Sequence, residues 1–161
     1  MNRNPGLWPA AATSLLLLVC APLSAQMTRQ EVIRQHAHDV MPFAMSKTVH
    51  IFKMTEHGGV QRVVTREAGT REEVALIQQH LMHEAARFQK GDFSDPAALH
   101  GTDMPGIKEL RQGAPRITVS YTALPNGAEI AFETADPRLV TAVHRWFGAQ
   151  LSEHGADARA E

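Results

Sequence analysis

A chain of 161 residues with 16 basic and 17 acidic side chains is long enough for one domain with its own core. Its near-neutral charge argues against a nucleic-acid partner or an anionic membrane surface, because both select basic patches. The only cysteine is Cys20, inside an apolar leader. The rest of the chain therefore has no thiol for a disulfide, a nucleophile or a metal.

Residues 1–25 have the order of an export signal. Arg3 supplies positive charge, residues 15–19 form the centre of an apolar run, and residues 21–25 are mostly small. The apolar run is too short for a permanent anchor. We expect cleavage near Ala25 and a periplasmic or secreted protein with no stable membrane anchor.

Residues 26–46 form the predicted helical lead of the mature chain, with Thr28 and Glu31 spaced as a capping box. A β-hairpin follows, with strands at 47–54 and 60–65 and a turn at residues 57–59. Residues 71–90 then predict a helix that ends at Gly91. Its apolar side chains recur at helical spacing: Val74, Ile77, Leu81, Ala85 and Phe88.

Residues 91–113 predict a connector with two short helices, because glycines and prolines stand at their expected ends. We expect this connector to pack as an ordered cap on the preceding helix and to bring His100 within ligand or hydrogen-bond reach of His80 or Glu84. A second hairpin (117–121 and 129–134) and a helix (137–154) follow. Residues 156–161 predict a polar, frayed tail.

The order of these elements predicts an α+β fold over residues 47–155. Two duplicated ββα units would form a four-stranded antiparallel sheet with two long helices on one face. Gly59 then matches Gly127. The alternative is that two unrelated ββα units look alike at this level. If Val49 and Ile51 face the helices, His50 and Phe52 share the uncovered face, where we also place Gln61.

The predicted metal ligands are His80, Glu84, His100 and Met104. His80 and Glu84 lie four residues apart on one flank of a helix, so they can bind one ion or bond to each other. His100 and Met104 project from a turn constrained by glycine and proline. An imidazole and a thioether suit copper, as Cu(I) or Cu(II), better than zinc. The alternative is a helix-capping histidine and a space-filling methionine.

Other potential ligands carry less weight. Met41, Met45 and His50 lie in the lead and the first strand, and His36 and His38 lie two residues apart in the lead. We assign His154 a structural role at a helix end. No phosphate-binding loop, nucleophile elbow or zinc-protease helix is present. We expect a binding protein rather than an enzyme, and leave catalysis open.

Several short segments are similar to a family of small exported proteobacterial proteins. These are residues 91–96 (GDFSDP), His100-Gly101, residues 104–106 (MPG), Trp146-Phe147, Gln150-Leu151 and His154-Gly155. The resemblance covers nearly all of the mature chain and implies a shared fold and connector. Some members carry the label aspartate carbamoyltransferase. The residues here do not support that activity, because no Ser-Thr-Arg-Thr phosphate loop is present.

The leading functional hypothesis is a periplasmic metal-binding protein for copper handling or tolerance. The alternative is an interaction or small-ligand-binding module that uses the uncovered sheet face and needs no metal. The partner is then a metal ion or a periplasmic protein, and the oligomeric state stays open.

Overall fold

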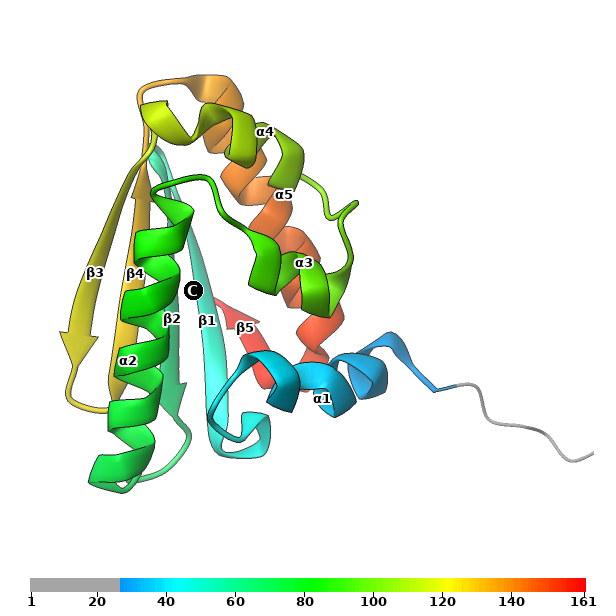
Figure 1. Cartoon of the computed structure of the whole chain (residues 1–161), viewed down its shortest axis with the longest axis vertical. Helices are drawn as coiled ribbons and strands as arrows, with labels where there is room; N and C mark the ends of the chain where they lie inside the picture. Colours follow the sequence, from blue (N-terminus) through cyan, green and yellow to red (C-terminus); the bar gives the residue numbers. More distant parts are fainter. Residues whose placement is uncertain (1–26) are drawn as a thin grey trace, which may run out of the picture.

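A computed structural model describes residues 27–161 (Figure 1). The predicted export signal lies outside these residues. The helices are α1 (Arg29–Val40), α2 (Arg71–Phe88), α3 (Ser94–His100), α4 (Ile107–Gly113) and α5 (Pro137–His154). The strands are β1 (Thr48–Thr55), β2 (Gly58–Thr65), β3 (Thr118–Leu124), β4 (Gly127–Glu133) and β5 (Ala158–Ala160). Within this part of the chain, no helix is long and apolar enough to cross a membrane.

The α+β class is confirmed, but the sheet has five strands and is mixed. Its order is β3-β4-β2-β1-β5, and β5 runs parallel to β1 whereas the other neighbours are antiparallel. The expected four-stranded, wholly antiparallel sheet is therefore wrong. It omitted the strand formed by the last residues of the chain.

The prediction of a frayed C-terminal tail is also wrong, because Asp157 anchors these residues. This carboxylate is buried, and it accepts hydrogen bonds from Arg34 Nη2 at 2.7 Å and Arg66 Nη2 at 2.9 Å. The residues that follow pair with β1, and the amide of Glu161 donates to the carbonyl oxygen of Phe52 at 3.0 Å. A short polar segment thus becomes ordered through tertiary contacts that local sequence does not reveal.

Helix starts follow the local sequence closely. Thr28 and Thr70 each cap a helix through a complete capping box, with Glu31 and Glu73 as the reciprocal partners. Asp136 caps α5 and is followed by Pro137 at the first helical position. Such caps depend on neighbours along the chain, so sequence patterns locate them well.

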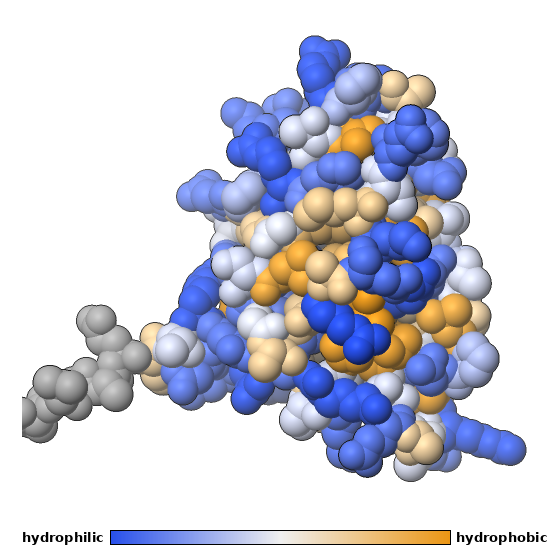
Figure 2. All heavy atoms as spheres, turned by 180° about the vertical axis from the view of Figure 1, so that it is seen from behind, coloured by the Kyte–Doolittle hydropathy of each residue, from blue (hydrophilic) through white to orange (hydrophobic). Residues whose placement is uncertain are grey.

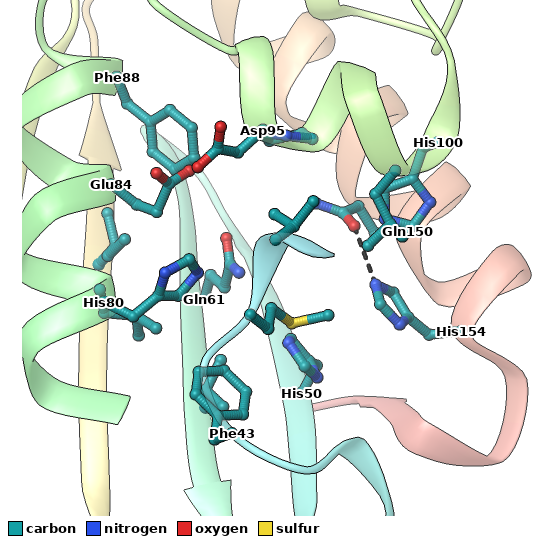
Figure 3. A pocket seen from close by; sticks show the side chains of 17 residues that line it. Phe43, His50, Gln61, His80, Glu84, Phe88, Asp95, His100, Gln150 and His154 are labelled. Carbon is teal, nitrogen blue, oxygen red and sulfur yellow. Dashed lines mark hydrogen bonds between the residues drawn. The ribbon is translucent and has the colours of Figure 1, made fainter. Parts of the chain in front are cut away.

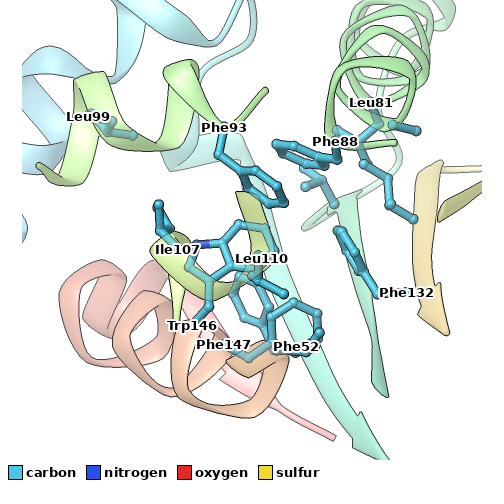
Figure 4. Packing of buried hydrophobic residues seen from close by; sticks show 14 of the residues in the cluster. Phe52, Leu81, Phe88, Phe93, Leu99, Ile107, Leu110, Phe132, Trp146 and Phe147 are labelled. Atoms are coloured by element: carbon cyan, nitrogen blue, oxygen red, sulfur yellow. The ribbon is translucent and has the colours of Figure 1, made fainter. Parts of the chain in front are cut away.

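Helices α2 and α5 cover the same face of the sheet, and the connector between the halves lies over them (Figure 1). Phe93, just before α3, stacks on Phe88 of α2 with ring centroids 4.7 Å apart. It also meets Trp146 of α5 edge to face at 5.4 Å (Figure 4). The connector is ordered, as predicted, but it bridges α2 and α5 instead of capping α2 alone.

The two faces of the sheet are the reverse of the expected assignment. Phe52 packs beneath the helices, 5.0 Å from Phe147 between ring centroids, and His50 and Gln61 line a cavity on that side. Val49, Ile51 and Val64 form a separate apolar cluster. Strand alternation defines two faces without deciding which one is covered. Figure 2, from the opposite side, shows apolar atoms crossed by many hydrophilic side chains.

Candidate functional site

A small cavity lies between the sheet, α2, α3, α5 and the segment that follows α1. Its volume is about 50 Å³, enough for a few water molecules or one small ion. Met41 contributes a thioether side chain to its wall. The other polar residues that line it are His50, Gln61, His80, Glu84, Asp95, His100, Gln150 and His154 (Figure 3).

Two buried histidines form one wall of this cavity. The rings of His50 and His154 lie 4.7 Å apart between centroids, and their planes are inclined by only 13°. Burial, with smaller contributions from His100 and His80, lowers the pKa of His50 to about 4. Burial, His50 and His100 lower the pKa of His154 further. Both imidazoles are therefore neutral at pH 7.

In each of these histidines, Nδ1 is buried without a hydrogen-bond partner among the described residues. Nε2 of His154 lies 3.2 Å from Oε1 of Gln150, so Nε2 carries the proton and donates it. The Nδ1 atom of His154 then presents a lone pair. Nδ1 of His50 likewise has no partner among the described residues, and Asp157 partly offsets the lowering of the His50 pKa.

Gln61 adds a third unpaired acceptor. It lies on β2, opposite Phe52 of β1, and its Oε1 is buried without a partner in the described part of the chain. Buried polar atoms are nearly always paired in folded proteins. Three such atoms belong to residues that line one cavity. They therefore indicate a place where a hydrogen-bond donor or a cation would satisfy unpaired acceptors of the protein.

The opposite wall carries a pair of acids. Burial, and then the charge of Asp95 and a hydrogen bond to it, raise the pKa of Glu84 to about 8. Two carboxyl groups that share a hydrogen bond hold a proton between them. Figure 3 shows these groups facing each other. Arg87 contacts both, with Nη1 2.6 Å from Asp95 and 3.3 Å from Glu84.

The structure places three of the four predicted ligands on this cavity. His80, Glu84 and His100 line it, whereas Met104 is buried in the apolar core beside another surface hollow. Among residues 27–161, no three His, Asp or Glu side chains are placed to hold one metal ion. The predicted set of four is thus not gathered at one point.

His100 does not bond to His80 or Glu84, contrary to the prediction. Its Nδ1 lies 2.7 Å from Oε2 of Glu153 in α5, and α3 packs against α1 instead of turning back to α2. Burial lowers the pKa of His100, and Glu153 partly offsets this. His80 meets the Phe43 ring edge-on at 5.6 Å, and burial lowers its pKa too.

Sequence reasoning assigned His154, Gln61 and Gln150 no ligand role. Gln150 occupies the position in α5 that Glu84 occupies in α2, and this match was the available signal. His154 lies against His50 and lines the cavity, so it does not serve as the charged helix cap that its position indicated. His36 and His38 are exposed on α1, and each lies within ion-pair distance of Asp39.

Comparisons with models of protein families, with curated proteins and with solved structures found no match. The resemblance stated from the connector and the last helix stays a prediction.

Proposed function

We propose that this protein binds a small cation in the cavity between its sheet and helices. The observation that supports the proposal is a set of three buried acceptors without partners among residues 27–161: Nδ1 of His50, Nδ1 of His154 and Oε1 of Gln61. Leaving such an atom unpaired costs about 1–3 kcal/mol. A cation bound in the cavity recovers this cost at each of these atoms that it reaches.

The charges around the cavity favour a cation over an anion. The guanidinium of Arg87, which contacts the lining residues Glu84 and Asp95, is paired with these two and with Asp92. The histidines are neutral and offer lone pairs. An anion would meet acceptors on the wall formed by His50 and His154. The cavity also has room for little more than a single ion or a molecule of a few atoms.

Copper is the first candidate, and copper handling or tolerance in the periplasm is the role we propose for it. Copper accepts imidazole and thioether ligands, both of which line the cavity. Zinc fits less well, because structural zinc takes four nitrogen, sulfur or oxygen ligands and catalytic zinc takes three. No such group is assembled in the described chain.

A small organic ammonium ion is the second candidate. The near-parallel rings of His50 and His154 support it, because parallel rings do not direct two lone pairs to one point as readily as inclined rings do. The sequence indicated, as the alternative, a small-ligand module that uses the uncovered sheet face. We now propose the cavity as the place where such a ligand binds. His50, Phe52 and Gln61 lie on that covered side.

We also propose that the two ββα units arose by duplication. In the β2–β4 pair, Gly59 lies opposite Phe132 and Gly127 lies opposite Val64. The offset that maps Gly59 onto Gly127 also maps Val64 onto Phe132, so this pairing is symmetric between the halves. The cavity then lies between equivalent helices, with Glu84 from one half and Gln150 from the other.

Thermal unfolding of the purified protein tests the binding proposal. Cu(I) under anaerobic conditions, Zn(II) and methylammonium are each added to wild type, His154→Phe and His83→Phe. The first variant keeps a ring in the cavity and removes its nitrogens, and the second makes the same change at an exposed site on α2. We expect Cu(I) or methylammonium to raise Tm in wild type and His83→Phe only. No shift with any cation, or an equal shift in His154→Phe, would contradict the proposal.

A further inference from the structure

We propose that two copies of this chain associate through β3, the strand at one edge of the sheet, so that their two sheets become continuous. This inference is independent of the cation site. β3 pairs with β4 on one side, and Figure 1 shows it at the margin of the sheet. Four of its seven residues are exposed, and the other three are partly buried.

Of the five strands in residues 27–161, β3 alone has no charged side chain. The other strands contain Lys53, Arg62, Glu129, Glu133 and Arg159. Edge strands of soluble proteins commonly carry a charge or a proline, which prevents pairing with another chain. In a two-fold pairing, a charged residue near the axis would lie close to its own copy. β3 has no such residue, and its composition therefore suits a second copy of itself.

The hairpin geometry shows which backbone groups of β3 face outward. Leu124 lies opposite Gly127 across a two-residue turn, so this pair is hydrogen-bonded and the pattern alternates from there. Val119, Tyr121 and Ala123 therefore direct their N–H and C=O groups away from β4. These are the groups that a further strand can reach.

A glutamine from α2 supports this assignment and occupies one end of the edge. Oε1 of Gln89 accepts a hydrogen bond from the amide of Val119 at 2.8 Å, and its Nε2 donates to the carbonyl of Ile117 at 3.0 Å. In the described chain, no side chain makes such a contact with the backbone of Tyr121 or Ala123. The middle of the edge is thus open.

The open groups match those of a second copy. With the two-fold axis at Thr122, Tyr121 of one copy lies opposite Ala123 of the other, and each such pair exchanges two hydrogen bonds. This register does not use the amide of Val119, so Gln89 keeps its contact. The pairing is isologous, because each copy offers the same residues.

The flank of α2 beside this edge would be buried in the same contact. Gln78 and Gln89 both bond to β3, and Met82 lies between them at helical spacing. Met82 is 55% exposed, and the exposed Ala75 and Ala86 share its flank. The two-fold axis of an antiparallel pair is perpendicular to the sheet. The α2 helices of the two copies therefore lie on the same face, with these uncharged flanks toward each other.

Sedimentation velocity from about 1 μM to about 1 mM protein tests the association. Thr122→Lys brings two positive charges together at the axis, which opposes pairing. Within one copy Thr122 lies opposite Glu129, so this variant keeps the fold. Thr102→Lys adds the same charge at an exposed site in the connector. We expect wild type and Thr102→Lys to dimerise with rising concentration and Thr122→Lys to stay monomeric. A monomeric wild type throughout, or equal dimerisation of both variants, would overturn the proposal.

Cysteine cross-linking tests the register. The two Thr122 residues form a non-hydrogen-bonded pair with Cα atoms about 4.5 Å apart, which is within the range of a disulfide. Thr122→Cys and Thr102→Cys, each combined with Cys20→Ala, are treated with a mild oxidant. We expect Thr122→Cys to form a covalent dimer at least tenfold faster than Thr102→Cys. Equal rates in the two variants, or no cross-link in either, would overturn the pairing through β3.

Discussion

The imidazole of His154 lies face to face with that of His50, 4.7 Å away, and neither Nδ1 has a partner in the described chain. Two neutral histidines held in this way cost stability in acid. In the unfolded chain a histidine binds a proton near pH 6.5, whereas His50 in the folded protein does so only near pH 4. The unfolded state therefore binds more protons in this interval, and stability falls with falling pH.

We predict that wild type loses stability relative to His154→Phe as the pH falls from about 6.5 to about 4. The variant removes one of the two groups that resist protonation, and it keeps the ring packing. Urea unfolding of both proteins across this interval measures the difference. A difference in unfolding free energy that does not change with pH would show that His154 is not held neutral by the fold.

Glu84 gives a pH dependence of the opposite sign. Its pKa rises from 4.5 to about 8 on folding, because of burial and then of Asp95, while Arg87 acts against this and Asp92 adds to it. Between these values the folded state binds the extra proton, so the wild type loses stability as the pH rises. Between pH 5 and pH 8 we expect the unfolding free energy of Glu84→Gln to rise by roughly 3 kcal/mol relative to that of wild type.

The exposed Glu72→Gln, in the first turn of the same helix, is the control for a change in net charge. Its unfolding free energy relative to wild type should not follow the rise measured for Glu84→Gln. A flat profile for Glu84→Gln, or the same profile in both variants, would mean that Glu84 does not carry the proton at neutral pH.

Gln61 should destabilise the protein when no ligand is bound. Its Oε1 is a buried acceptor without a partner in the described chain, so Gln61→Leu should raise the unfolding free energy by roughly 1 kcal/mol. Gln78→Leu is the matched change, because Nε2 of Gln78 donates to the carbonyl of Leu124 at 2.9 Å and is satisfied. It should lower the unfolding free energy by a similar amount. Chemical denaturation that finds both variants weakened would show that Gln61 is satisfied too.

Asp157 should control the order of the last strand. Asp157→Asn removes the charge that pairs with Arg34 and Arg66, so we expect the unfolding free energy to fall by roughly 2 kcal/mol. We also expect faster hydrogen exchange at the amide of Glu161. The exposed Asp39→Asn on α1 should leave that amide unchanged. Slow exchange at Glu161 in both variants would assign the order of β5 to backbone pairing alone.

The long helices were predictable because caps and apolar spacing are local. Residues 137–154 are helical as expected, with Asp136 and Pro137 at the start. The strand β5 was not predictable, because its order comes from Asp157 meeting two arginines far away in sequence. The same limit applied to His50. Alternation placed it with Phe52 on one face, but only the packing against α5 showed that this face is covered.

The candidate site was predictable in part, for the same reason. His80, Glu84 and His100 line one cavity. Helical spacing and a constrained turn, which local sequence reveals, had marked these three residues. Met104 and its neighbours have the same constrained turn, yet the thioether packs into the core. Which nitrogen of a histidine lacks a partner depends on the whole fold. That property separates His154 from the exposed His83, and no spacing rule reveals it.

Nitrogen-15 NMR of the histidine rings, recorded at pH 7 before and after anaerobic addition of Cu(I), tests the central claim most directly. It reports the protonation and ligation of each ring nitrogen separately. The account predicts that Nδ1 of His50 and of His154 carries a free lone pair in the metal-free protein, and that both signals shift when the ion binds while those of His83 do not. Protonated Nδ1 atoms in the metal-free protein, or signals that Cu(I) leaves unchanged, would contradict it.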